Sequence, residues 1–300
     1  MSRRPNKSTT VRTFRQLERH AAQASLHTTR LALTTLSRVV PSAAVAAASE
    51  LFVTPRRTRR RDKQRFLAEQ GLELSIPRPR GPLRGLAWGP AEAPPVLLVH
   101  GWSGNASQLD AFVAPLVARG RRVLAFDLGG HGTSSGRHAT IVSLAEDLLA
   151  IGDRMGPFAG VVAHSFGGPV TTVACLAGLA VKRGVFIAPP YDAADWLQRF
   201  TAWLAFGPET ATALRHCLER RVGVAFADLD ARRLVDTAPF PLRVIHDEDD
   251  LEVPLVDGEQ LVAGWPRATL RKTRGLGHHR ILRDPEVVRW TVDFITEEPS

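Results

Sequence analysis

The sequence predicts an α/β protein whose central, mainly parallel sheet is covered by helices on both faces. Short apolar runs recur along the 300-residue chain, and stretches with helical periodicity separate them. The runs are continuously apolar rather than alternating, which is typical of strands buried on both faces of a parallel sheet. A chain of this length can bury a large core, and it contains no apolar stretch long enough to span a membrane as a helix.

Each predicted element follows from its local pattern. The Pro- and Gly-rich stretch 71–82 is typical of short edge strands and turns. The predicted inner strands cover 96–99, 122–126, 160–163, 185–188, 242–245 and, shorter and more polar, 270–273. Helices are expected over 107–118, 142–151 and 170–180. Asp284 and Pro285 suit the N-cap and first position of a last helix that runs through Phe294.

The positive charge of the chain belongs to its first 65 residues. The formal net charge is +9, but residues 1–65 hold 15 Lys and Arg side chains against three acids, which leaves the other 235 residues at −3. We expect a solvated basic arm that can contact anionic membranes or other polyanions. It lacks the pattern of a specific nucleic-acid module. We also expect turnover to survive removal of residues 1–65.

Within this segment, the pattern predicts a surface helix from Thr28 to Phe52, kinked at Pro41 and ended by Pro55. Residues 56–61 should form an exposed charged linker. The predicted organisation is therefore a basic N-terminal segment, 1–65, followed by an α/β domain, 66–300. The oligomeric state is not predicted.

The cysteine and histidine content argues against metal and disulfide chemistry. Cys175 and Cys217 are too few for a disulfide scaffold, so we expect a reducing, cytoplasmic location. The histidines outside the polar loops show no metal-ligand spacing, and there is no phosphate-binding glycine fingerprint. No metal and no other cofactor is expected.

Polar residues follow the predicted strands, where chemistry collects in parallel sheets. Ser165 lies between a strand and a helix, with the small residues Ala163 and Gly167 two positions away on either side. This pattern predicts a nucleophile elbow, a turn so tight that these neighbours must be small. An ordinary serine in a βα turn is the competing interpretation.

A serine nucleophile needs a base and an orienting acid. In the order Ser, Asp, His, the sequence offers Ser165, Asp250 and His278. Asp247, Glu248 and Asp249 also lie close enough in sequence to reach an imidazole, and His279 adjoins His278.

Together, these loops resemble the α/β-hydrolase superfamily over roughly residues 70–296. His100–Gly104 is similar to its H-G-x-x-G oxyanion loop, and Ala163–Gly167 to its elbow. Asp127–Ser134 is similar to its D-x-P-G-H-G-x-S loop, with Gly129 in place of proline, and Asp250–Pro254 to its D-x-x-V-P acid loop. Within the superfamily, the chain looks closest to uncharacterised bacterial members.

The resemblance implies the α/β-hydrolase fold and favours Asp250 and His278 as the partners of Ser165. The other three acids are then expected to form a solvated loop. The backbone N–H groups of Trp102 and Phe166 would form the oxyanion hole. We expect His100 to tie its loop together and His164 to point away from the nucleophile.

The resemblance also implies a helical cap at about 190–239. Aromatic residues at helical spacing are more often packing than substrate contacts. We nevertheless take as candidate substrate contacts Trp102 in the first loop and Trp196, Trp203 and Phe206 in the cap.

We therefore expect a serine hydrolase that cleaves a small-molecule carboxylic ester. The same triad also serves thioesterases, acyltransferases and hydrolases of C–C bonds. A non-catalytic binding protein with this fold is the alternative of a different class.

Overall fold

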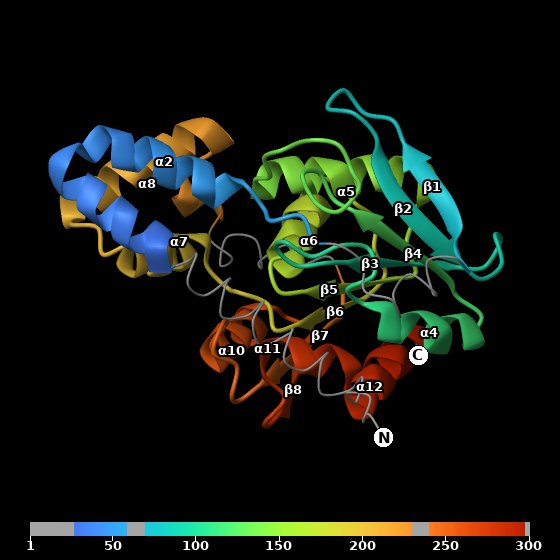
Figure 1. Ribbon diagram of the computed structural model, residues 1–300. Coiled ribbons are helices and arrows are strands. Elements are labelled where there is room, and N and C mark those ends of the chain that lie inside the picture. Colours follow the sequence, from blue (N-terminus) through green and yellow to red (C-terminus); the bar gives the residue numbers. More distant parts are fainter. Residues whose placement is uncertain (1–26, 59–69, 230–239, 298–300) are drawn as a thin grey trace, which may run out of the picture. The chain divides into compact units, whose positions relative to one another are not determined.

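The computed structural model describes residues 27–58, 70–229 and 240–297 (Figure 1). The described residues divide into two compact units, one formed by 27–51 and 195–221 and the other by 52–58, 70–194, 222–229 and 240–297. The larger unit contains the sheet, and the smaller unit is helical. The sequence-based division at residue 65 thus differs from these compact units, because residues 52–58 belong to the sheet unit.

The sheet has eight strands in the order β1-β2-β4-β3-β5-β6-β7-β8. Only the pairs β1–β2 and β2–β4 are antiparallel. The strands are β1 (Leu72–Ile76), β2 (Leu83–Trp88), β3 (Pro95–Val99), β4 (Arg122–Asp127), β5 (Gly160–His164), β6 (Gly184–Ile187), β7 (Leu242–Asp247) and β8 (Ala268–Thr273). The prediction of a mainly parallel α/β-hydrolase sheet is confirmed.

Helices cover both faces of the sheet, with α5 and α6 on one face and α4 and α12 on the other (Figure 1). The helical elements of this unit are η1 (Asp110–Phe112), α4 (Val113–Ala118), α5 (Ile141–Met155), α6 (Gly167–Leu176), η2 (Phe226–Leu229), α10 (Leu255–Gly264), α11 (Gly277–Arg280), η3 (Ile281–Arg283) and α12 (Pro285–Thr296). Inner strands β5 and β6 are buried along their whole length, which explains their continuously apolar sequence.

Local sequence fixes the ends of two covering helices. The Asp284 side chain accepts hydrogen bonds from the N–H groups of Glu286 and Val287, at 3.0 and 3.1 Å, so it caps α12 as predicted. Thr140 and Ser143 form a reciprocal capping box at the start of α5. The helix expected over 107–118 is shorter than predicted, since only η1 and α4 form there.

The smaller unit joins two segments that lie far apart in the sequence. It contains a helix over 27–39, most of α2 (Pro41–Val53), nearly all of α7 (Ala193–Trp203) and most of α8 (Pro208–Val222). Its fully buried side chains include Ala44, Ala48, Leu204, Leu214 and Leu218. The Thr34 hydroxyl donates to the Leu204 carbonyl at 2.6 Å, and Arg221 pairs with Glu50 at 2.8 Å.

Two expectations for the N-terminal segment need correction. Residues 27–51 pack within a helical unit, so this part is not a solvated arm. Its helix is broken rather than kinked, since one helix ends at Val39 and the next begins at Pro41. Proline lacks the N–H that would continue the first helix but suits the first position of a new one. No helix among the described residues is long and apolar enough to cross a membrane.

Candidate active site

Ser165 stands in a strained turn between β5 and α6. Its φ angle is 51°, in the left-handed region that non-glycine residues rarely adopt. The turn is held because the Ser165 N–H donates to the Ile187 carbonyl and its carbonyl accepts from the Gly168 N–H, both at 2.9 Å. A Cβ atom at Gly167 would lie 2.8 Å from the Val99 carbonyl oxygen, so only glycine fits there. This is the backbone geometry of a nucleophile elbow.

The loop after β3 approaches this elbow closely. A Cβ atom at Gly101 would lie 3.1 Å from the Cβ of Ser165, tighter than ordinary packing. The rings of Trp102 and Phe166 meet edge to face at 5.6 Å. Within the described part of the chain, the N–H groups of these two residues make no hydrogen bond to protein. Both backbone donors are therefore available to bind a ligand atom, a property that an oxyanion hole needs.

His278 and Asp250 are buried and bonded to each other. His278 Nδ1 lies 2.7 Å from Asp250 Oδ2, and the second carboxylate oxygen accepts from the N–H groups of Glu252 and Val253, at 2.8 and 3.0 Å. Burial alone would raise the pKa of Asp250, but these hydrogen bonds, the one from His278 foremost, lower it. A carboxylate bonded to Nδ1 leaves Nε2 as the nitrogen that can accept a proton.

The bond that would complete a triad is open. Between the described residues Ser165 and His278, no hydrogen bond joins the hydroxyl to the imidazole. Catalytic hydrogen bonds in unliganded sites are often long and tighten only when substrate binds.

Asp247 holds the histidine loop and does not form part of a solvated acidic loop, which corrects the expectation for this residue. It is fully buried. Its carboxylate accepts from the Leu276 and Gly277 N–H groups at 3.0 and 2.9 Å and from the Thr273 hydroxyl at 2.7 Å. Burial opposes ionisation, but these bonds outweigh it and lower the pKa of Asp247. The loop that carries His278 is thereby fixed to the end of β7.

The profile of a family described as the alpha/beta hydrolase fold matches residues 94–278, more than half of the chain. The chain belongs to this family. Serine hydrolase-like proteins of Danio rerio and Homo sapiens are 45% identical over 65 residues and 44% over 63 residues, respectively. The matches cover 22% and 21% of this chain, but only 20% and 30% of those relatives. These two relatives come from animals, so the closeness to uncharacterised bacterial members stays a prediction.

Solved structures with the same fold include two esterases. The esterase from Pyrococcus furiosus is 19% identical, with a TM-score of 0.60 over 81% of this chain and 97% of the other. The esterase RhEst1 from Rhodococcus is 20% identical, with a TM-score of 0.57 over 76% and 99% of the two chains. At this level of identity the likeness shows the fold alone.

His164 supports the α/β hydrolase's histidine loop, a role that the sequence analysis missed. Its ring lies 4.7 Å from the His278 ring, and its Nε2 is 3.0 Å from the His278 carbonyl oxygen. That the ring points away from Ser165 stays a prediction. Burial lowers the pKa of His164 well below its usual value, so the ring is neutral and donates to that carbonyl. In the sequence, only its position directly before Ser165 indicated such a role.

His100 bonds within its own loop, as predicted, and it also links this loop to the loop after β4. Its Nδ1 lies 2.8 Å from the Gly101 carbonyl oxygen, and its Nε2 accepts from the Leu128 N–H at 3.0 Å. The described Asp127 side chain is fully buried and accepts from the N–H groups of Ala106 and Thr133, at 2.6 and 2.7 Å. The loops after β3 and β4 are therefore held together by buried polar contacts.

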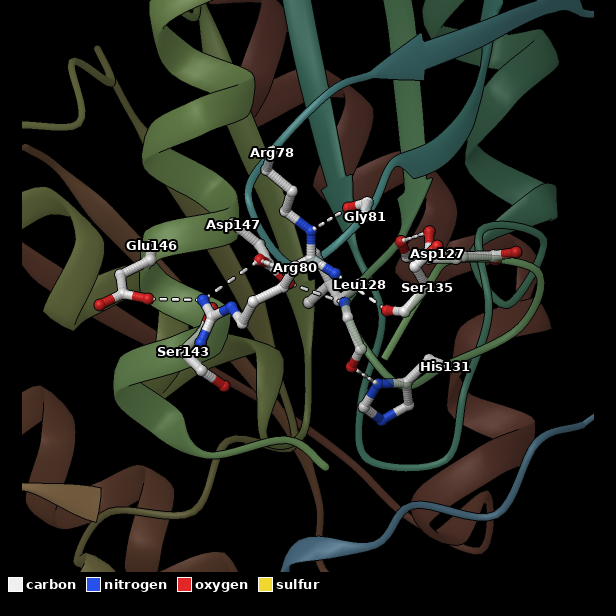
Figure 2. A network of polar contacts seen from close by, with 12 residues as sticks. Arg78, Arg80, Gly81, Asp127, Leu128, His131, Ser135, Ser143, Glu146 and Asp147 are labelled. Carbon is white, nitrogen blue, oxygen red and sulfur yellow. Dashed lines mark hydrogen bonds and ion pairs between the residues drawn. The ribbon is translucent and has the colours of Figure 1, made fainter. Parts of the chain in front are cut away.

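A buried ion pair also holds the loop after β4 (Figure 2). Arg78 pairs with Asp147 on α5, and both side chains are buried. The other Asp147 oxygen accepts from the Gly129 N–H at 2.7 Å. Arg78 also donates to the carbonyls of Gly81 and Ser135, each at 2.9 Å. Nothing in the sequence pattern paired residues 78 and 147.

Residues 56–58, the described part of the linker expected over 56–61, form hydrogen bonds to the same loops; residues 59–61 lie outside the described residues. Arg57 donates to three carbonyls of the loop after β4, those of Gly132, Ser134 and Gly136, at 2.7, 3.0 and 2.6 Å. Ser103, the residue after Trp102, accepts from the Arg56 N–H at 2.9 Å and from the Thr58 hydroxyl at 3.0 Å. The segment is exposed as expected, but its hydrogen bonds tie it to the candidate oxyanion loop.

The remaining candidates are placed as follows. Trp196, Trp203 and Phe206 are half-buried and belong to the smaller unit, where the rings of Phe200 and Trp203 stack at 6.1 Å. Their role as substrate contacts stays a prediction. Among the described residues, no group of histidine, cysteine and acidic side chains is arranged to hold a metal ion.

Proposed function

We propose that the protein is a serine hydrolase that cleaves carboxylic esters through an acyl-enzyme. Ser165 is the nucleophile, His278 the general base and acid, and Asp250 the group that orients the imidazole. The observation that carries the proposal is the 2.7 Å bond between Asp250 and His278 in a fold whose elbow holds Ser165 at φ 51°. The N–H groups of Trp102 and Phe166 supply the oxyanion hole.

In this mechanism, the hydroxyl proton of Ser165 moves to His278 Nε2 as Oγ bonds to the ester carbonyl carbon. The backbone donors stabilise the negative oxygen that forms. The bond to the leaving oxygen then breaks while Nε2 returns the proton to that oxygen, which yields an alcohol and the acyl-enzyme. Water attacks the acyl group next, with Nε2 again taking and returning a proton, and this step releases the acid and restores Ser165.

An active-site label tests the nucleophile directly. A fluorophosphonate should label the wild-type protein at Ser165, and Ser165→Ala should abolish both labelling and ester hydrolysis. Ser75→Ala is the matched control, because Ser75 is exposed on the outermost strand β1, which three strands separate from β5. Labelling that persists in Ser165→Ala would move the nucleophile elsewhere. A chain that neither reacts with the label nor turns over esters would instead be a binding protein with this fold.

A series of p-nitrophenyl esters from acetate to palmitate then defines the acyl group. The value of kcat/KM should pass through a maximum at the chain length that fills the acyl site, and should fall for longer chains. If the protein is labelled at Ser165 but hydrolyses none of these esters, its substrate contains another acyl bond, such as a thioester.

A further inference from the structure

A second carboxylate stands beside the open nitrogen of the candidate base. Glu252 Oε2 lies 4.0 Å from His278 Nε2, while Glu252 Oε1 lies 3.0 Å from Nε2 of His279. The side chain of Glu252 is 55% exposed, in contrast to the buried Asp250. Nδ1 of His278 therefore contacts the buried carboxylate of Asp250, and Nε2 lies near the solvent-exposed carboxylate of Glu252.

Both the backbone and the side chain of Glu252 are bonded to residues of the site. Its backbone N–H donates to Asp250 Oδ1 at 2.8 Å, and its side chain is held by His279. The hydrogen bond from His279 is the largest cause that lowers the pKa of Glu252, so the group is an anion at neutral pH. This carboxylate therefore carries a negative charge and is oriented by its contact with His279.

The proposed mechanism places the leaving group next to this charge. The leaving oxygen receives its proton from His278 Nε2 and must come within hydrogen-bond distance of that nitrogen, roughly 3 Å. The first atoms beyond the leaving oxygen then lie beside a carboxylate that is 4.0 Å from the same nitrogen. A cation two or three bonds from the leaving oxygen would be attracted there, and an anion would be repelled.

We propose that Glu252 selects esters whose leaving alcohol carries a positive charge close to the ester oxygen, that is, esters of amino alcohols. This inference rests on the proposed function. His279 acts as the positioning residue that aims the carboxylate. The neighbouring acids do not share this role. Glu248 pairs with Arg274 at 3.1 Å, and Asp249 accepts from the Gly275 N–H at 3.0 Å.

A carboxylate in this position has another potential effect, which acts on all substrates alike. It can stabilise the imidazolium that forms in both steps, and removing it would then slow cationic and neutral esters by the same factor. The ratio of kcat/KM between two esters of the same shape separates the two effects, because only leaving-group selection changes this ratio.

The experiment compares the 2-(trimethylammonio)ethyl ester with the neutral 3,3-dimethylbutyl ester of the same acid, the acid being the best one from the p-nitrophenyl series. The wild-type protein should favour the cationic ester by about tenfold in kcat/KM, the effect of about 1.4 kcal/mol of differential binding. Glu252→Gln should bring the ratio close to one, and Glu252→Lys should reverse it. Glu248→Gln is the matched control and should keep the wild-type ratio.

Salt gives an independent readout on the wild-type protein. The preference should shrink as ionic strength rises, since the carboxylate is half exposed and therefore screened. A wild-type ratio near one, or a ratio that Glu252→Gln leaves unchanged, overturns the inference. Labelling at Ser165 and turnover of p-nitrophenyl esters would stand in that case, so failure here is distinct from failure of the proposed function.

Discussion

At the scale of single residues, Gly101 shows how little room the candidate site leaves. A Cβ atom there would lie 3.1 Å from Ser165 Cβ and 3.2 Å from both Nδ1 and the carbonyl oxygen of His164. Gly101→Ala should fold, because neighbours must shift by only a few tenths of an ångström. The shift moves the Trp102 N–H from its place, and losing one oxyanion donor typically costs 10²–10³ in kcat. We expect kcat to fall by at least about tenfold.

The measurement is kcat with a p-nitrophenyl ester, alongside thermal unfolding. Gly207→Ala serves as the control, because nothing lies within 4 Å of a Cβ atom at that position. Unchanged turnover in Gly101→Ala would show that the loop carrying Trp102 does not need its close approach to the elbow.

Asp247 supports a second prediction at this scale. All the groups that face its carboxylate are donors, including the N–H groups of Leu276 and Gly277 and the Thr273 hydroxyl. Asp247→Asn would turn an NH₂ group toward one of these donors and leave both without an acceptor. We expect the free energy of unfolding to fall by about 1–3 kcal/mol, and kcat to fall because the His278 loop loosens.

Urea unfolding and ester turnover check this, with Asp153→Asn on the exposed face of α5 as the control. If Asp247→Asn matches the control in both measurements, the carboxylate does not hold the loop.

Sequence reasoning at this scale worked where a residue type carries its own chemistry. A serine between two small residues after a strand, or a histidine after Gly277, can be singled out without coordinates. The roles of Asp247 and His164 could not be, because both act by bonding backbone groups of a loop more than 25 residues further along the chain. An acid that bonds backbone amides looks the same in sequence as an acid that faces water.

At the scale of elements, the segment 56–58 changes what removal of the N-terminus should do. Arg57 donates to three carbonyls of the loop after β4, and Thr58 donates to the carbonyl of Ser103 beside the candidate oxyanion donor. Losing these bonds frees both loops, so we no longer expect turnover to survive deletion of residues 1–65. The double variant Arg57→Ala/Thr58→Val should lower kcat/KM about tenfold, since oxyanion donors must be preorganised.

The double variant keeps the rest of the N-terminal segment, so its effect belongs to the lost hydrogen bonds. Arg84→Ala, at an exposed position on β2, is the charge-matched control. Equal kcat/KM values for the double variant and the control would mean that the loops hold their shape without the segment.

Elements differed in how well their sequence predicted them. The inner strands were predicted because burial on both faces leaves a continuous apolar run, which is a local signal. No local pattern predicts that residues 27–51 pack with residues 195–221, because the sequence of each segment alone is typical of an amphipathic or basic helix. The composition of the first segment indicated a solvated arm, whereas the tertiary contacts of Ala44 and Ala48 place it in a core.

At the scale of the whole molecule, buried neutral histidines tie stability to pH. His100, His131, His164 and His246 are buried, and burial lowers the pKa of each, that of His131 to about 3. In the unfolded chain each titrates near 6.5. Below that pH the unfolded state binds protons that the folded state refuses, so stability is full above about pH 6.5 and is lost as pH falls toward the folded pKa.

His131→Asn tests this linkage, because the asparagine amide can still donate to the Gly129 carbonyl that His131 Nδ1 meets at 3.0 Å. One histidine contributes at most about 1.4 kcal/mol per pH unit between its two pKa values. The free energy of unfolding, measured in urea from pH 8 to pH 4, should therefore fall less steeply in His131→Asn than in the wild-type protein. His138→Asn, at an exposed position, is the control. Parallel curves for His131→Asn and the wild-type protein would mean that the fold takes up this proton as readily as the unfolded chain does, and the acid sensitivity would then have to come from groups other than the loops around the candidate site.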